Sequence, residues 1–328
     1  MLLLTDAQVR QLLDFSEVID RVESAFAAHG RGETLAAGLT HTESPGGEFH
    51  VKTGGLPGVF GAKVNGSFSP AEGSSRPSIR GVIILFDANN GTPLAILDSG
   101  AITAVRTAAA TAVAAKYLAR PDSEVMTIAG CGVQGRAQLE ALSMTLPLRT
   151  VHAWSRSDQR AADFAEEMSD RLTLNVRPTR DVREATRSSD VIVTCTPATQ
   201  PLLLSGDLSR GSFAAAVGGD SPHKQELASD LVAASSVVPD VLEQCLLVGE
   251  LHHAVDAGLM RAEHIYAELG AIVAGLVPGR VSSDEIFVFD STGTAMQDVA
   301  AGISVYERAI RKGMGTEFVF SFTPSKVP

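Results

Sequence analysis

The sequence predicts an α/β protein that combines a Rossmann-type, doubly wound parallel sheet with a second, α+β domain. Three observations lead to this prediction. From about residue 121 onward, short apolar segments alternate with helical ones, as in parallel βαβ units covered on both faces. A Gly-x-Gly-x-x-Gly motif directly follows the first apolar segment and opens a helix. About the first 115 residues lack this alternation, so we expect them to form a separate domain.

The N-terminal region opens with a helix. Asp14 and Glu17 form a capping pair ahead of an apolar stripe with helical spacing. Residues 33–80 are rich in Gly, Ser and Pro and contain short extended pieces at 48–52 and 59–64. This region is therefore expected to hold a few short strands rather than further helices.

Two apolar segments, at 81–86 and 93–98, are expected to pair as a hairpin. The dipeptide Asn90-Gly91 between them favours a tight turn. The next segment, 103–118, has the composition of a helix made of small residues. Its many alanines allow a neighbouring surface to approach closely.

The rest of the chain alternates strand and helix. Strands are expected at 125–129, 150–154, 191–196, 213–217 and 285–290, and helices at 134–146, 158–168 and 295–312. We expect the last helix to pack back onto the N-terminal region.

Composition excludes several classes of function. The 328 residues carry a net charge of −11, with 38 acidic and 27 basic side chains, so most of the surface would repel a nucleic acid. No segment approaches the ~20 apolar residues of a membrane span, and the N-terminal residues do not resemble a signal peptide. The 3 dispersed cysteines and the spacing of the histidines give no metal signal. We therefore expect a cytoplasmic protein with reduced thiols and no metal.

The glycine motif predicts a dinucleotide site. Gly130 permits a tight turn, Gly132 lets the backbone approach a pyrophosphate, and Gly135 allows close helix–strand packing. The N-terminus of the following helix supplies unpaired N–H groups to the phosphates. We expect the cofactor to contact these three glycines together with Val133 and Gln134.

The end of the second predicted strand bears on the choice of cofactor. NAD enzymes usually place an acidic residue there to bind the adenosine ribose. This chain has Ser155 and Arg156 instead, with no acid before Asp158. A hydroxyl and a guanidinium suit a 2′-phosphate, so the sequence favours NADP(H), while NAD(H) stays possible.

Several motifs in order resemble the ornithine cyclodeaminase/mu-crystallin family. They are GAKVNG (61–66), ITAVRTAAA (102–110), AAKYLARPDS (114–123), GCGVQGRAQLEAL (130–142), VGGDSPHKQEL (217–227), VGE (248–250) and VFDSTG (288–293). The resemblance implies a homodimer and a reaction at the amine or imine carbon of a small amino acid. It also implies a substrate-binding and dimerisation domain, here residues 1–118 and 301–328, around an NAD(P)-binding Rossmann domain at 119–300.

Three side chains are the expected centre of the chemistry. Arg106 is the only charged residue between Asp98 and Lys116, so a largely apolar helix would bury a cation that needs an anionic partner. The resemblance implies that Arg106 holds a substrate carboxylate beside the cofactor, and that Lys63 contacts the substrate and takes part in catalysis. Asp220 follows a predicted parallel strand, where ligands usually bind, and the resemblance implies an acid/base role for it.

The resemblance also implies further cofactor contacts, and the sequence departs from the family pattern in one respect. The additional cofactor contacts would come from Arg106 and from Thr107, Thr196, Val217, Ser291 and Gly293.

Family cyclodeaminases carry another arginine for the substrate carboxylate before the Lys63 motif. Residues 33–51 hold no Arg or Lys, so Lys52 would take that role, with His50 as an alternative. This departure counts against ornithine as the substrate.

Three functions are therefore consistent with the sequence. The first is an NAD(P)H-dependent reductase or dehydrogenase that interconverts an imino acid, such as a cyclic ketimine, and the corresponding amino acid. The second is a cyclodeaminase, an ammonia-lyase that uses tightly bound NAD as an internal redox cofactor. The third is a ligand-binding protein without turnover, against which the presence of Lys63, Arg106 and Asp220 together argues. The residues themselves do not define the exact substrate.

Overall fold

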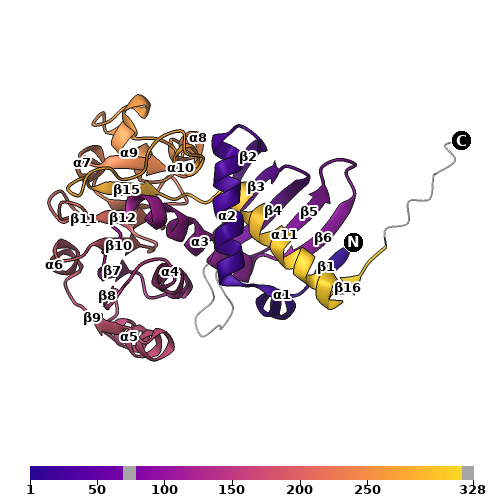
Figure 1. The fold of residues 1–328 in the computed structure, drawn as a ribbon, viewed down its shortest axis with the longest axis horizontal. Helices are drawn as coiled ribbons and strands as arrows, with labels where there is room; N and C mark the ends of the chain where they lie inside the picture. The colour runs from indigo at the N-terminus through magenta and orange to yellow at the C-terminus, as the bar shows by residue number, and fades with distance from the viewer. Residues whose placement is uncertain (69–78, 320–328) are drawn as a thin grey trace, which may run out of the picture.

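The computed structural model describes residues 1–68 and 79–319, which form two seven-stranded sheets side by side (Figure 1). The remaining parts of the chain, including 320–328 of the predicted substrate-binding domain and part of the segment 33–80, lie outside the described residues. No helix among the described residues is long and apolar enough to cross a membrane.

The N-terminal sheet is mixed and has the strand order β16-β1-β6-β5-β4-β3-β2. All neighbours are antiparallel except β1 and β6. Its strands are β1 (Leu2–Leu4), β2 (Leu35–Ser44), β3 (Gly47–Leu56), β4 (Val59–Phe68), β5 (Ile79–Asp87), β6 (Pro93–Asp98) and β16 (Thr316–Glu317). The helices that accompany it are α1 (Asp6–Leu12), α2 (Phe15–Gly30), α3 (Gly100–Leu118) and α11 (Ala295–Lys312).

The second sheet is parallel throughout, with the order β14-β15-β12-β10-β7-β8-β9. Its strands are β7 (Val125–Ala129), β8 (Thr150–Trp154), β9 (Asn175–Pro178), β10 (Val191–Thr194), β12 (Phe213–Ala216), β14 (Ser236–Pro239) and β15 (Phe287–Asp290). The order reverses between β7 and β10, which is the point where doubly wound folds bind ligands. The predicted Rossmann-type α/β fold class is thus confirmed.

Helices and short strands surround the parallel sheet. They are α4 (Val133–Ser143), α5 (Asp158–Leu172), α6 (Val182–Arg187), α7 (Ser229–Ala233), α8 (Leu242–Cys245), α9 (Glu250–Asp256) and α10 (Leu269–Val273), with β11 (Thr199–Leu203), β13 (Gln225–Leu227) and a 3-10 turn at Ala262–His264. The predicted helix 295–312 and strands 125–129 and 150–154 have the observed bounds, and the predicted helix 134–146 is shorter in the structure.

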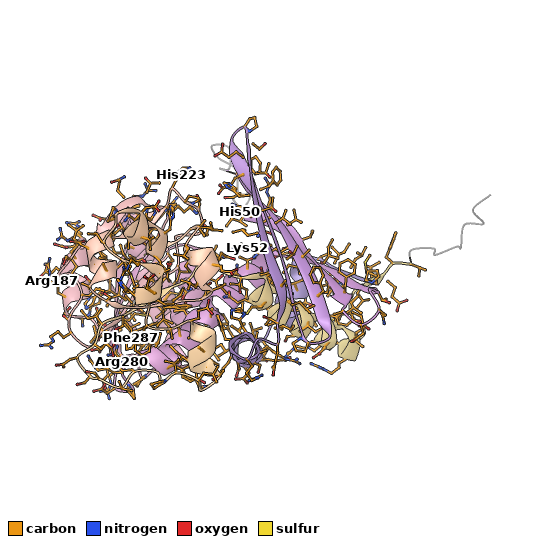
Figure 2. All side chains as sticks on the ribbon, turned by 90° about the horizontal axis from the view of Figure 1, so that it is seen from above. His50, Lys52, Arg187, His223, Arg280 and Phe287 are labelled. Carbon is orange, nitrogen blue, oxygen red and sulfur yellow. The ribbon has the colours of Figure 1, made fainter. Side chains whose placement is uncertain are left out.

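The region 33–68 departs most from the prediction. Instead of short extended pieces, it forms three ten-residue strands joined by tight turns. Glycines supply the turns, because Gly46 and Gly58 have φ of 85° and 83°. The strands are rich in Gly, Ser and Thr, and one end of the sheet extends past its helices (Figure 2). This composition conceals the period of two that normally reveals a strand.

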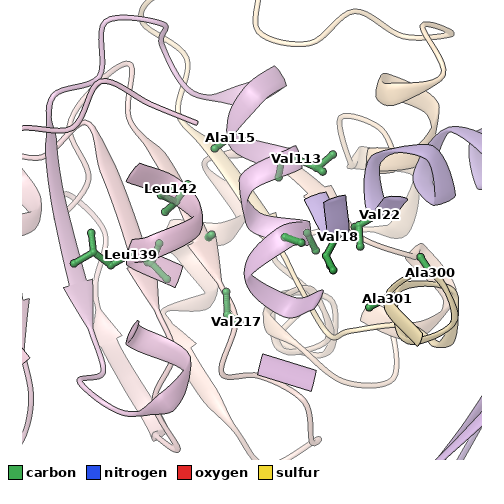
Figure 3. Packing of buried hydrophobic residues seen from close by; sticks show 14 of the residues in the cluster. Val18, Val22, Val113, Ala115, Leu139, Leu142, Val217, Ala300 and Ala301 are labelled. Atoms are coloured by element: carbon green, nitrogen blue, oxygen red, sulfur yellow. The ribbon is translucent and has the colours of Figure 1, made fainter. Parts of the chain in front are cut away.

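Helix α3 joins the two halves of the molecule through one continuous apolar core. Figure 3 shows Val113 of α3 between Val18 of α2 and Leu139 of α4. Most side chains of α3 that point into this core are alanines with no exposed surface. Their small size lets helices on both sides approach α3, which fixes the relative position of the two sheets.

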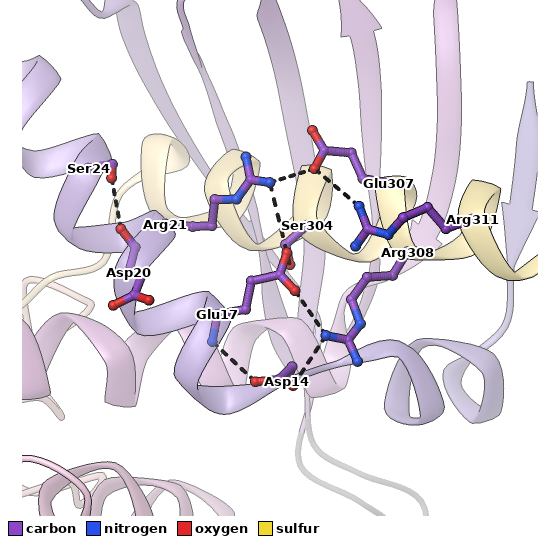
Figure 4. Close-up of polar contacts among 9 residues, drawn as sticks. All are labelled: Asp14, Glu17, Asp20, Arg21, Ser24, Ser304, Glu307, Arg308 and Arg311. Carbon is purple, nitrogen blue, oxygen red and sulfur yellow. Dashed lines mark hydrogen bonds and ion pairs between the residues drawn. The ribbon is translucent and has the colours of Figure 1, made fainter.

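Helices α2 and α11, from opposite ends of the chain, are joined by a polar seam (Figure 4). Arg308 donates hydrogen bonds to Asp14 at 3.2 Å and Glu17 at 2.9 Å, and Arg21 contacts Glu307 at 2.5 Å. Beside this seam, α11 packs closely on β4, because a Cβ on Gly61 would lie 2.6 Å from the Val299 side chain. These contacts hold α11 against the N-terminal sheet.

Candidate functional site

A cleft of about 870 Å³ lies between the two sheets. One wall is the face of β3 and β4 that carries Lys52 and Lys63, and the other is the carboxyl edge of the parallel sheet. The predicted site residues that line it are Lys52, Lys63, Arg106, Thr107, Gly132, Val133, Gln134, Thr196, Val217, Asp220, Ser291 and Gly293. The structure therefore brings together most of the residues singled out from the sequence.

The glycine turn after β7 has the geometry of a phosphate cradle. Gly130 has φ of 121°, and a Cβ there would lie 2.6 Å from the Cys195 carbonyl oxygen. A Cβ on Gly135 would lie 2.0 Å from the Gly130 oxygen, so only glycine allows α4 to begin this close to the strand. At Gly132 a Cβ would meet no protein atom within 4 Å. That space faces the cleft and suits a pyrophosphate.

Unpaired polar atoms in the cleft wall also fit a dinucleotide. The side-chain oxygens of Thr103, Gln134 and Ser291 are buried and have no hydrogen-bond partner among the described residues. All three residues line the cleft. Buried polar atoms normally have partners, so these oxygens are available to a bound ligand with hydrogen-bonding groups.

A buried ion cluster forms the floor of the cleft. The Asp298 carboxylate on α11 lies 2.7 Å from Lys63 Nζ and 2.8 Å from Arg106 Nε. Arg106 Nη1 also donates to the Gln297 side chain at 2.9 Å. The three charged side chains are at most 5% exposed. Arg106 Nη2 makes no hydrogen bond to the described residues, so one edge of the guanidinium can still receive an anion.

Lys52 lies beside this cluster on the neighbouring strand, directly opposite Lys63 in the β3–β4 register. Its Nζ donates to the carbonyl oxygens of Thr292 at 3.0 Å and Gly293 at 2.6 Å. Figure 2 shows Lys52 on the side of β3 that faces the parallel sheet. The cleft floor thus holds three cations, and only Lys63 and Arg106 contact the Asp298 carboxylate. This excess of positive charge favours a small anion.

The excess of cations changes the acidity of the lysines. Burial and the nearby Arg106 guanidinium lower the pKa of Lys63 from its ordinary value to about 7, although Asp298 opposes the change. Burial and Arg106 also lower the pKa of Lys52. A lysine with a pKa near neutrality can both donate and accept a proton under ordinary conditions.

Asp220 stands across the cleft, in the loop after β12. It forms an ion pair with Lys224, and its side chain is 41% exposed. Enclosure by the protein raises the pKa of the Asp220 carboxyl, but the Lys224 charge outweighs this and the net pKa is lowered. Asp220 is therefore a carboxylate at neutral pH, suited to accept a proton or to hold a cationic nitrogen.

A buried carboxylate fixes the two loops that meet at the carboxyl edge of the sheet. Glu226 accepts hydrogen bonds from the Thr196 backbone at 2.6 Å, the Thr196 hydroxyl at 2.7 Å and the Gly218 backbone at 2.9 Å. Glu250 in turn accepts from the backbone of Glu226 at 2.8 Å. These contacts fix the positions of the loops after β10 and β12, which line the cleft.

Two predicted cofactor residues lie apart from the rest. Ser155 and Arg156 follow the end of β8 and are not among the residues that line the cleft. Arg156 is exposed and forms no ion pair within the part of the chain that the structure describes. The nearest acid in sequence, Asp158, is paired with Arg180 at 3.0 Å.

Three charged residues of the site were not predicted from the sequence: Asp298, Lys224 and Glu226. For Asp298 a signal was present, since it is the only charged residue between Asp290 and Glu307 on a helix with an apolar face. The same reasoning identified Arg106, and the two side chains are each other's buried partner. Lys224 and Glu226 lie in an irregular stretch whose contacts depend on the fold.

Comparison with known proteins agrees with the geometry. The profile of the ornithine cyclodeaminase/mu-crystallin family matches residues 1–313. Among curated relatives, the alanine dehydrogenase of Archaeoglobus fulgidus is 36% identical over 320 residues, which cover 97% of this chain and 98% of the relative.

Solved structures are similar over the whole chain. An archaeal alanine dehydrogenase dimer with bound NAD has a TM-score of 0.94 and 35% identity, covering 98% of this chain and 99% of its own. The Δ1-pyrroline-2-carboxylate reductase of Thermococcus litoralis, with NADH and L-proline, has a TM-score of 0.91 and 33% identity, covering 97% and 100%. A lysine cyclodeaminase has a TM-score of 0.87 and 28% identity, covering 99% and 97%.

Proposed function

This chain belongs to the ornithine cyclodeaminase/mu-crystallin family, and we propose that it is an NAD(P)H-dependent oxidoreductase that interconverts a small imino acid and the corresponding amino acid. The observation that carries the proposal is the convergence of Lys52, Lys63 and Arg106 opposite the glycine turn. Such a site binds a small carboxylate beside a dinucleotide. Reductases and dehydrogenases of this kind are among its relatives.

The cations would hold the substrate carboxylate. Arg106 has one free guanidinium edge, and Lys52 is anchored by two backbone carbonyls that fix its ammonium group in the cleft. A guanidinium and an ammonium on one side of an anion restrict its orientation as well as its position. The reactive carbon would then face the cofactor, which supplies or accepts a hydride when bound.

Proton movement at the substrate nitrogen requires a separate group. Lys63, with a pKa of about 7, is suited to donate a proton during reduction and to take it back in the reverse direction. Asp220 would stabilise the positive charge on the substrate nitrogen from the opposite wall. Substrate and cofactor would thus be held between the two sheets, with charged groups of opposite sign on opposite walls.

We propose NADP(H) as the preferred cofactor, with NAD(H) also accepted. Arg156 is exposed and unpaired within the described residues, while Asp158 is already paired with Arg180. A guanidinium is favourable for a 2′-phosphate and indifferent to a ribose hydroxyl. The similar archaeal alanine dehydrogenase structure holds NAD, so the ratio of the two activities in this chain is a direct test.

We also propose a homodimer formed through the open face of the N-terminal sheet. This face is opposite to the one covered by α11 and carries exposed apolar residues, among them Leu35, Phe49, Val64 and Val82. An apolar surface of this kind is typical of an obligate interface. The proposed division is 1–118 with 301–328 for substrate binding and dimerisation, and 119–300 for the cofactor. Helix α11 spans the second boundary.

We place the protein in the cytoplasm, because its three cysteines are free thiols. Cys245 is buried, and Cys131 and Cys195 are partly buried. Burial raises the pKa of the Cys131 thiol to about 11. A thiol of this kind is unreactive, which fits a reducing compartment.

A cyclodeaminase is the second candidate, favoured by the similarity to lysine cyclodeaminase. One experiment separates the two. Purified protein is mixed with NADPH or NADH and with cyclic imino acids, or with 2-oxo acids and ammonia, while nicotinamide absorbance is followed. Substrate-dependent oxidation supports the oxidoreductase. Ammonia release from a diamino acid without net oxidation or reduction would replace it with the cyclodeaminase, and neither reaction would overturn both.

A further inference from the structure

The tip of the β2–β3 hairpin carries a cluster of side chains that the proposed reaction does not use. His41 Nε2 lies 2.7 Å from one oxygen of the Glu48 carboxylate, and His50 Nε2 lies 3.1 Å from the other. The donor atoms of these three residues all lie within 4.8 Å of one another. Figure 2 shows His50 beyond Lys52 along the same strand, toward the tip of the hairpin.

Strand register explains why residues far apart in the hairpin meet. His41 is directly opposite His50, and Glu43 is directly opposite Glu48. The two imidazole rings stack with centroids 4.8 Å apart and an angle of 16° between their planes. Residues that are paired across strands, or two apart along one strand, share a face of the sheet. One face of the hairpin thus bears two histidines followed by two carboxylates.

The Glu43–Glu48 pair is unfavourable without a cation. Like charges directly opposite each other on two strands destabilise the pairing. Both residues line the cleft, together with His50, so the charge is concentrated where the surface is concave. A divalent cation bound at the hairpin relieves this repulsion.

We propose that His41, Glu48 and His50 bind one divalent transition-metal ion, with Zn²⁺ as the best fit. Two imidazole nitrogens and one carboxylate oxygen are a common ligand set for this ion. Metal–ligand bonds of about 2.0–2.2 Å place ligands of a tetrahedral site about 3.4 Å apart. The present separations reach this value by small side-chain movements. The ion would lie between the two Nε2 atoms and the Glu48 carboxylate, which now contact each other directly.

Three protein ligands leave a fourth position of a tetrahedral ion open. Glu43 lies directly opposite Glu48 in the strand register and also lines the cleft, so its carboxylate is a candidate for that position. Glu48 and His50 of the site line the same cleft as the proposed cation floor, but the site shares no residue with that floor. Zn²⁺ binding can therefore be measured without turnover of the redox reaction.

The test is calorimetric titration of chelator-treated protein with ZnCl₂ alone. We expect one site per chain, and a loss of affinity of about 100-fold or more in His41→Ala. His41 lies outside the cleft lining and on an exposed hairpin, so the variant should keep its melting temperature. His41→Gln, which preserves the polarity of the hairpin, must show the same loss. His264→Ala, which removes an exposed histidine that contacts Arg261, must bind as tightly as the unmodified protein.

A second readout reports the ligand set directly. Co²⁺ bound to two histidines and a carboxylate in a tetrahedral site gives strong visible absorption, and we expect this signal from the unmodified protein but not from His41→Ala. Absence of a Zn²⁺ site, or a site that survives unchanged in both His41 variants, would overturn the proposal.

Discussion

Replacing Asp298 by Asn removes the carboxylate that contacts both Lys63 and Arg106, the only one to do so among the residues that the structure describes. The amide has the same shape, so the change isolates charge from packing. Removing one partner of a buried ion pair typically costs about 3–5 kcal/mol, because the remaining charge is left without compensation. In the variant, Lys63 and Arg106 both lose their anionic partner. Only Lys63 can avoid an uncompensated buried charge, because it can release its proton.

This difference makes the cost depend on pH. The pKa of Lys63 is about 7, well below the ordinary 10.5, and Asp298 opposes that decrease. Without the carboxylate the pKa falls further, so the folded variant binds fewer protons than the original protein at and below neutral pH. The Lys63 part of the cost is therefore full at low pH and disappears as the pH rises above about 7. It amounts to about 1.4 kcal/mol for each unit by which the pKa falls.

Urea unfolding at two pH values measures the effect. We expect Asp298→Asn to lose about 3–5 kcal/mol of unfolding free energy near pH 6, and distinctly less near pH 8.5, where only the unpaired Arg106 remains. Asp284→Asn is the matched control, because Asp284 is exposed and contacts Arg210 at 3.4 Å. It should change stability by less than about 0.5 kcal/mol at both pH values. An equal loss at both pH values for Asp298→Asn would refute the assignment of the titrating charge to Lys63.

Three further predictions concern the cofactor site and the buried acids. Arg156→Ala should raise the KM for NADPH about tenfold and leave that for NADH unchanged; equal effects in steady-state assays with the two cofactors would contradict a 2′-phosphate contact. Gly132→Ala should weaken dinucleotide binding, measured by fluorescence titration, without loss of stability, whereas Gly135→Ala should also destabilise the fold by about 1–3 kcal/mol, because its Cβ would lie 2.0 Å from the Gly130 oxygen. Burial raises the pKa of Asp290 from 3.8 to about 7, so its protonation stabilises the folded state at low pH, and this contribution is lost as the pH rises through about 7. Asp290→Asn should therefore flatten the decline in stability between about pH 4 and 7, and an unchanged slope in chemical denaturation would exclude this role.

The parallel sheet was largely predictable from the sequence, because its signals are local. The strand at 125–129, the turn at Gly130 and the helix at 295–312 each depend on apolar spacing within a few residues. Asp14 acts as the predicted cap, since its side chain accepts a hydrogen bond from the Glu17 backbone at 3.2 Å. Local chemistry also identified the isolated cation Arg106.

The features that escaped prediction depend on register and on distant partners. His41 and His50 are nine positions apart, and only the pairing of β2 with β3 brings them together. Asp298 meets Lys63 only because α11 crosses the sheet at that strand. The low pKa of Lys63 is likewise a property of the assembled cluster, since the sequence contains no other charged residue within eight positions of Lys63.

The position of α11 has a consequence for the order in which the molecule assembles. A ribosome releases the chain from its N-terminus, and domains generally fold as they emerge. The strands that carry Lys52 and Lys63 are synthesised early, yet the helix that covers them and supplies Asp298 begins only at Ala295. The parallel sheet can therefore form first, and the N-terminal sheet reaches its final packing only after synthesis has passed that helix. A truncated chain that ends before Ala295 would therefore lose the packing of the N-terminal sheet, which is synthesised first, rather than that of the parallel sheet, which is synthesised later.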